Sequence, residues 1–209
     1  MDDVLDQYER PESEKEPVIC LDEQPLQLLE DSRPGEAMRP GQPAKEDYEY
    51  QRCGTCSVFV AVTPKAGRRF VQVRRHRKKA DFARFVRDVL KRHPRATKIH
   101  LVLDNLNTHK PASLTETFGP RKAAKLLRRI EWHYTPKHAS WLNMAEIELS
   151  AMTRQCTSQR LSSLEAAQSE INAWAKTRNR KKTRIHWKFN KADAQNVFPS
   201  LYERKKLAG

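Results

Sequence analysis

The sequence has no apolar run that approaches the length of about 18 residues needed for a membrane-spanning helix. Its opening segment, MDDVLDQYERPESEKEP, is acidic, whereas a signal peptide begins with a basic segment followed by an apolar one. We therefore expect no membrane association and a cytoplasmic location. The length of 209 residues is typical of one domain with short additions.

Cysteine is scarce as well. Four cysteines in this length are too few for a disulfide scaffold, and they fit thiols in a reducing compartment. Cys53 and Cys56 form a single C-x-x-C pair, but zinc would need a second ligand pair, and only single candidates such as His76 and His93 exist. We therefore interpret Cys53 and Cys56 as turn residues beside a strand, in preference to a zinc site or a redox pair. No G-x-x-x-x-G-K-[ST] phosphate-binding motif is present.

Acidic residues become scarce after residue 50, and this asymmetry is informative. Residues 1–50 carry a net charge of −10, whereas residues 51–209 carry +24. Such a basic body indicates a polyanionic partner, and nucleic acid is the favoured one, although a solvated basic surface is the alternative. The bases cluster in RRFVQVRRHRKK, RKAAKLLRR and RNRKKTR. From these runs and one further lysine we predict phosphate contacts by Arg74, Arg75, Lys78, Lys79, Lys137, Arg180, Lys181 and Lys182.

The order of apolar runs and turns predicts a mixed α/β fold. Short strands are expected at PVICLDE, on both sides of a turn with Pro64 and Gly67, at KIHLVLDN and at IEWHYTP. A proline-rich, charged segment over residues 30–50 predicts a long loop. Helices are expected over 79–93, over 110–129 and after residue 141. The pattern predicts a five-stranded mixed sheet with a hairpin at one edge, parallel crossovers elsewhere and flanking helices.

Two of the predicted strands end in aspartate, at Asp22 and Asp104. If these strands are neighbours, both carboxylates lie at the carboxyl edge of the sheet, where open α/β sheets place their chemistry. Two close carboxylates repel unless a cation lies between them or one keeps its proton. In a chain built for nucleic acid, Mg²⁺ is the natural cation, and a third acid would complete a site for two ions that serves phosphoryl displacement.

The third acid comes from the helix that follows YTPKHASWLN. Its apolar positions repeat at helical spacing and predict one buried face, formed by Leu142, Ala145, Leu149, Met152 and Cys156. Glu146 and Glu148 fall on opposite flanks of that face, at similar angles from its centre. Periodicity alone therefore leaves both acids open as the third ligand.

Three segments, CLDEQPLQLL, LVLDNLNTH and HYTPKHASWLNMAEIELS, resemble the catalytic motifs of the mariner-related bacterial insertion-sequence transposases. The resemblance extends over nearly all of the chain from about residue 17. It implies a ribonuclease H-like fold with an Asp-Asp-Glu triad. The family's D-N-x-x-x-H motif matches Asp104, Asn105 and His109, and its L-N-P-x-E motif matches Asn143 and Glu146, with methionine in place of the proline.

The resemblance therefore implies Asp22, Asp104 and Glu146 as catalytic residues and metal ligands, with Glu148 as the second choice. It implies Mg²⁺ or Mn²⁺, two ions in all, as cofactor. The implied reaction is hydrolysis of a phosphodiester at the end of a mobile element, followed by attack of the freed 3′-hydroxyl on target DNA. Asn105, His109 and Asn143 are possible supporting residues, although a helix that follows a strand also favours asparagine and threonine as caps at this place.

The family also sets expectations for domains and partners. Residues 1–16 are expected to be a linker or a short N-terminal extension, and residues 17–209 the catalytic domain, with a helical, basic tail from about residue 161. Relatives carry helix-turn-helix modules before the catalytic domain, and we find no such pattern here. A separate DNA-binding polypeptide and a homodimer on DNA are therefore expected. An inactive DNA-binding remnant and another nuclease of the same fold stay open as alternatives.

Overall fold

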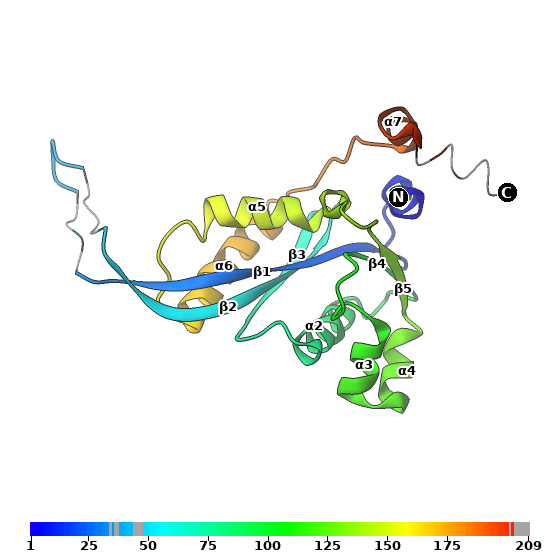
Figure 1. Ribbon diagram of the computed structural model, residues 1–209, viewed down its shortest axis with the longest axis horizontal. Helices are drawn as coiled ribbons and strands as arrows, with labels where there is room; N and C mark the ends of the chain where they lie inside the picture. The colour runs from blue at the N-terminus through cyan, green and yellow to red at the C-terminus, as the bar shows by residue number, and fades with distance from the viewer. Residues whose placement is uncertain (34, 36–37, 44–47, 201, 203–209) are drawn as a thin grey trace.

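The computed structural model describes residues 1–33, 35, 38–43, 48–200 and 202. Its centre is a sheet with the strand order β3-β2-β1-β4-β5 (Figure 1). The strands are β1 (Val18–Asp31), β2 (Tyr50–Thr63), β3 (Arg68–Arg74), β4 (Ile99–Leu103) and β5 (Ile130–Tyr134). The first three pair in antiparallel fashion, while β4 runs parallel to both β1 and β5. The predicted five-stranded mixed sheet is confirmed.

Strand β1 is much longer than predicted. It does not stop near Asp22 but continues to Asp31, and it pairs with β2 over most of that length. The apolar residues of the added segment, such as Leu28, pack in a cluster with helix residues that follow later in the chain, and this tertiary contact outweighs the polar composition. The predicted long loop shrinks to residues 32–49, of which 34, 36–37 and 44–47 lie outside the described residues.

Cys53 and Cys56 lie inside β2, which corrects the expectation of turn residues. The pairing register of β1 and β2 shifts between Gln27 and Leu29, and the extra residue falls in β2 near Gly54, whose φ is 100°. This β-bulge leaves Cys53 exposed, while Cys56 is 2% exposed and packs in the core.

The helices are α1 (Asp2–Glu9), α2 (Lys79–Arg92), α3 (Pro111–Phe118), α4 (Pro120–Leu127), α5 (Ala145–Gln155), α6 (Leu164–Arg180) and α7 (Lys191–Val197), with a short 3₁₀ turn, η1 (Ser140–Leu142). The stretch predicted as one helix over 110–129 is two helices, because Gly119 has a φ of 76° and Pro120 starts a new helix. Among the described residues, no helix combines the length and apolar character needed to cross a membrane.

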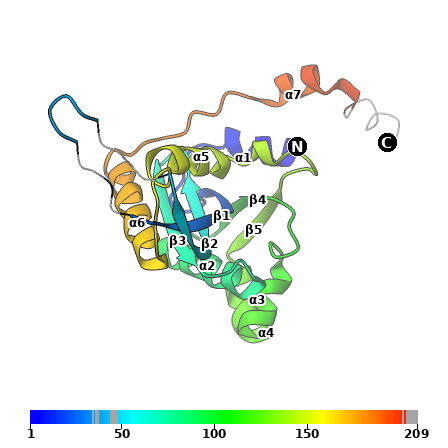
Figure 2. The ribbon, with the colours of Figure 1, turned by 60° about the vertical axis from the view of Figure 1, so that its left-hand side comes forward.

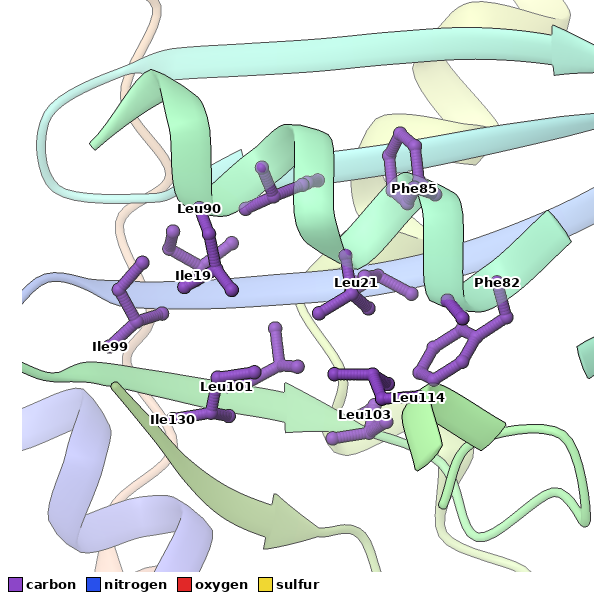
Figure 3. Close-up of a cluster of buried hydrophobic side chains, with 14 of the residues drawn as sticks. Ile19, Leu21, Phe82, Phe85, Leu90, Ile99, Leu101, Leu103, Leu114 and Ile130 are labelled. Atoms are coloured by element: carbon purple, nitrogen blue, oxygen red, sulfur yellow. The ribbon is translucent and has the colours of Figure 1, made fainter. Parts of the chain in front are cut away.

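Helices cover both faces of the sheet, with α2, α3 and α4 on one side and α1 and α5 on the other (Figure 2). The helix expected over 79–93 is confirmed as α2, and its buried residues Phe82, Phe85 and Leu90 belong to one cluster with Ile19 and Leu21 of β1 (Figure 3). The opposite face holds two further buried clusters. One joins α5 and α6 to β2 and β3, and the other joins α1 to β1 and β4.

Helix α1 belongs to this second layer. Val4, Leu5 and Tyr8 are nearly fully buried and pack with Cys20 of β1 and Val102 of β4. The start of the chain is therefore built into the core as a helix. The phenolic hydroxyl of Tyr8 also donates a hydrogen bond to the carbonyl oxygen of Leu142, at 2.6 Å, which connects α1 to the turn that precedes α5.

Candidate active site

Asp22 and Asp104 lie side by side on neighbouring parallel strands. Cys20 of β1 is level with Val102 of β4, and each aspartate comes two residues later in the chain. Asp22 is 8% exposed, and Asp104 directly follows the end of β4 and is partly exposed. The two predicted strand ends therefore meet, although β1 itself runs on past Asp22.

Glu146 reaches the same place from α5. It lies in the first turn of that helix and is partly exposed. The charges of Glu146 and Asp104 both act on the carboxyl group of Asp22 and raise its pKa. Three carboxylates from three separate segments thus meet at the carboxyl edge of β4.

Glu148 points into a different environment. Its side chain is fully buried, and both of its oxygens are bound by Arg69 of β3, at 2.9 Å and 3.1 Å, and by Arg178 of α6, at 3.0 Å and 3.1 Å. With both oxygens committed to guanidinium groups, Glu148 has no oxygen left for a ligand at the sheet edge. Of the two glutamates, Glu146 is the one whose charge acts on Asp22, whereas Glu148 is paired with two arginines.

The pKa of Asp22 is raised from its ordinary value to about 7. Burial is the main cause; a hydrogen bond from the amide of Glu23, at 2.8 Å, works in the opposite direction, and the charges of Glu146, Glu23 and Asp104 raise the pKa further. Burial, together with the charges of three neighbouring carboxylates, therefore favours the neutral form of Asp22. A hard divalent cation with oxygen ligands fits this donor set.

His109 bridges two acids behind the site. Its Nδ1 lies 2.5 Å from Oδ1 of Asp104, and its Nε2 lies 2.8 Å from Oε2 of Glu23. Burial lowers the pKa of His109, but the two hydrogen bonds and the charges of both carboxylates outweigh it and raise the pKa to about 9. For Asp104, burial raises the pKa, but the hydrogen bond and charge of His109, the amide of Leu106 and the charge of Lys110 outweigh it, so that the net shift is downward.

This bridge was not anticipated from the sequence. His109 is fully buried and both of its ring nitrogens have carboxylate partners, so it holds Asp104 in place rather than facing a ligand. Glu23 was missed as a member of the site, although its position directly after Asp22 on a strand was a usable signal. Successive strand residues point to opposite faces, which puts Glu23 and Asp22 in different surroundings.

The two asparagines differ in their roles. Asn143 is fully buried; its amide donates to the carbonyl oxygen of Leu21, at 2.9 Å, and lies 3.5 Å from Oδ2 of Asp22. Asn105 is exposed and accepts a hydrogen bond from Lys110. It does not cap the next helix, because α3 begins at Pro111. Asn143 therefore orients Asp22 directly, while Asn105 stays at the surface of the site.

The predicted phosphate-binding residues divide into two groups. Arg74 is mostly buried and contacts Gln72, at 2.5 Å, and Asp88, at 3.7 Å, while Lys79 forms an ion pair with Glu116 at 2.9 Å. Lys79 is nevertheless exposed, as are Arg75, Lys78, Lys137, Arg180, Lys181 and Lys182. The interior partners of Arg74 give it a packing role, which leaves the exposed residues as the better candidates for DNA contacts.

Trp141 of the turn η1 is 42% exposed. It packs against three aromatic rings of the C-terminal segment, namely Trp187, Phe189 and Phe198, with ring centroids 5.2–6.4 Å apart. The tryptophan therefore holds that segment against the turn before α5 and keeps one side open to solvent.

A mixed sheet of this order, with acids at the edge of its central strands, defines a ribonuclease H-like protein. The chain belongs to the DDE superfamily endonuclease family, whose model matches residues 17–168. A comparison with curated proteins finds no match. The predicted ribonuclease H-like fold is confirmed by solved structures.

Two of these structures come from the transposase Mos1. The crystal structure of the Mos1 strand transfer complex is 14% identical, with a TM-score of 0.50, and the match covers 86% of this chain and 53% of that one. The Mos1 paired-end complex with the left transposon end is also 14% identical, with a TM-score of 0.51 and coverages of 87% and 57%. This chain thus spans just over half the length of the solved proteins it matches.

Proposed function

We propose that this chain is the catalytic domain of a DNA transposase related to the mariner group, which cuts a phosphodiester bond and joins the resulting 3′-hydroxyl end to target DNA. The observation that carries the proposal is that Asp22, Asp104 and Glu146 lie close together. Burial and the charges of the neighbouring acids raise the pKa of Asp22 to about 7. The membership of the DDE superfamily endonuclease family supports the same reaction class.

The three carboxylates are the proposed ligands for Mg²⁺ or Mn²⁺. Held by these carboxylates, two such ions would supply stabilisation of the attacking and the leaving oxygen in an in-line phosphoryl displacement. The protein itself contributes by holding the three carboxylates in place. Asn143 holds Asp22 through its amide, His109 holds Asp104, and the first turn of α5 presents Glu146.

DNA is the proposed substrate and partner. The net charge of +24 over residues 51–209 supports it, because a positive surface attracts the phosphate backbone without reading its sequence. The exposed bases Arg75, Lys78, Lys137, Arg180, Lys181 and Lys182 are the proposed contacts. Transposition handles two DNA ends, and we therefore propose that two copies of the chain act together on DNA.

The test is nicking of supercoiled plasmid in Mg²⁺ or Mn²⁺, followed by joining of an oligonucleotide with a free 3′-hydroxyl to the plasmid. The wild type is expected to nick and to join. Asp104→Asn and Glu146→Gln are expected to fold normally and to lose both activities. Glu165→Gln serves as the matched control, because Glu165 is exposed at the start of α6. A wild type without nicking, or active triad variants, contradicts the proposal; nicking without joining reduces it to a nuclease.

A further inference from the structure

A second cluster of metal-binding side chains lies outside the three carboxylates. His100 is on β4, and Glu131 and His133 are on β5. The parallel register pairs His100 with Glu131 and Val102 with His133, so all three side chains project from the same face of the sheet. Their ligand atoms lie within 4.8 Å of one another. Both histidines are 3% exposed, whereas half of the Glu131 side chain is open to solvent.

The two imidazole rings face each other closely. Nδ1 of His100 lies 3.0 Å from Nε2 of His133 and 3.8 Å from Oε2 of Glu131. In a tetrahedral zinc site with metal–nitrogen bonds of about 2.0–2.1 Å, donor atoms are about 3.4 Å apart. The observed separations lie on either side of that value, so small side-chain movements bring the three atoms around one ion.

The hydrogen bonds of His133 decide which nitrogen is available. Its Nδ1 lies 2.9 Å and 3.0 Å from the two carboxylate oxygens of Asp3, in the first turn of α1, and as the donor to that carboxylate it must carry a proton. In the neutral ring, Nε2 then keeps a lone pair directed at His100. A carboxylate that holds the far nitrogen of a metal-bound histidine is the usual outer partner in protein metal sites.

His100 is left with an unsatisfied nitrogen. If its Nδ1 donates to His133, its Nε2 becomes an acceptor, and no described residue forms a hydrogen bond with that buried atom. Glu16 is the nearest acid, with Oε2 3.9 Å away, and it can only accept. The opposite tautomer directs Nε2–H toward Glu16, but it turns two lone pairs toward each other across 3.0 Å. A cation between the rings resolves this conflict.

We propose that His100, His133 and Glu131 bind one divalent transition-metal ion of the zinc class, with Asp3 as the outer partner of His133. Two imidazoles and one carboxylate select zinc, cobalt or nickel over Mg²⁺, which prefers oxygen ligands. Three protein ligands leave a fourth position for solvent, and the exposed Glu131 marks the path of entry. The ion would fasten α1, through Asp3, to β4 and β5.

The proposed site is separate from the candidate active site. His100 precedes Asp104 by four residues along the same strand direction, a distance of about 13 Å at about 3.3 Å for each strand residue. The inference therefore does not depend on the proposed transposase activity. Its failure would leave the three carboxylates and their chemistry untouched.

The test is a calorimetric titration of the full chain with Zn²⁺. The buffer contains excess Mg²⁺, which fills the sites that are made of oxygen ligands. One Zn²⁺ per chain is expected. Glu131→Gln, a surface change that leaves the fold intact, should weaken binding by at least about tenfold, and Asp3→Asn by about 10- to 100-fold. His76→Asn is the matched control, because His76 is exposed and outside the cluster, and it should bind as the wild type does.

Co²⁺ provides a second readout. Tetrahedral nitrogen and oxygen ligation gives visible absorption bands without the near-ultraviolet thiolate band that binding by the exposed Cys53 would produce. We expect those bands in the wild type and in His76→Asn, and their loss in His133→Asn. No stoichiometric Zn²⁺ binding, or binding that is equally tight in Glu131→Gln and Asp3→Asn, overturns the proposal, as does a thiolate band.

Discussion

Arg69 binds both carboxylate oxygens of Glu148, with Nη2 2.9 Å from Oε1 and Nε 3.1 Å from Oε2, and neither side chain is exposed. Arg178 of α6 binds the same two oxygens. Glu148 thereby connects α5 to β3 and α6. Two residues earlier on the same helix, Glu146 lies beside Asp22. Two acids that look alike in the sequence therefore have different partners.

This difference predicts that the same substitution has a large effect on stability at Glu148 and a small one at Glu146. Glu148→Gln should lower the free energy of unfolding by about 3–5 kcal/mol, because it leaves Arg69 buried without its partner charge. Glu146→Gln should change it by no more than about 1 kcal/mol, because Glu146 is partly exposed. Urea unfolding followed by circular dichroism measures both. Equal stability of the two variants would contradict the assigned partners.

The bridge through His109 predicts a pH dependence of stability without metal. The pKa of His109 is about 9 in the folded protein and near 6.5 in the unfolded chain. Between pH 6.5 and 9, the folded state therefore keeps a proton that the unfolded state has lost. The stabilising contribution is complete below pH 6.5 and is lost as the pH rises through 9. Its size is up to about 3 kcal/mol, at about 1.4 kcal/mol for each pKa unit.

The measurement is urea unfolding in EDTA between pH 6 and 9.5, for the wild type and for His109→Asn. The wild type should lose stability relative to the variant as the pH rises. Parallel curves for the two proteins would show that His109 carries no such proton linkage.

Arg74 and Arg75 are neighbours with different predicted roles. Because Arg75 is exposed, Arg75→Ala should change the free energy of unfolding by no more than about 0.5 kcal/mol. It should also reduce the slope of the logarithm of DNA affinity against the logarithm of salt concentration by about one, the value for one lost phosphate contact. Arg74→Ala should instead destabilise the fold, by about 1–2 kcal/mol, because its guanidinium contacts Gln72 and Asp88. Fluorescence anisotropy on duplex DNA at several salt concentrations, together with urea unfolding, separates the two. An unchanged salt slope in Arg75→Ala removes it from the DNA surface.

The packing of α1 predicts that the acidic start of the chain contributes to stability. Leu5 is 1% exposed, and Leu5→Ala should cost about 2–5 kcal/mol through lost burial and a new cavity. Leu106→Ala is the matched control, because Leu106 is 42% exposed, and it should cost less than about 1 kcal/mol. Thermal unfolding of both variants provides the comparison. A Leu5→Ala protein as stable as the control would mean that α1 is detached in solution.

Local patterns were sufficient where a residue's surroundings follow from its neighbours in the chain. The buried stripe of α5 follows from helical periodicity and is confirmed, and the buried residues of α2 repeat at the same spacing. The split at Gly119 and Pro120 was visible in principle, because proline favours the first position of a helix. The length of β1 was not, because its polar second half is held by pairing with β2.

By itself, the sequence determined the alternation of strands and helices, the basic body and the two aspartates that end apolar runs, because these properties depend on composition and short-range periodicity. Only the tertiary structure decided which glutamate of α5 faces Asp22, since the answer depends on Arg69 and Arg178, which are far away in the chain. The bridge from Asp104 through His109 to Glu23, and the pairing of His100 with His133, likewise exist only after the strands are placed side by side. Long-range contacts of this kind leave no periodic trace in the sequence.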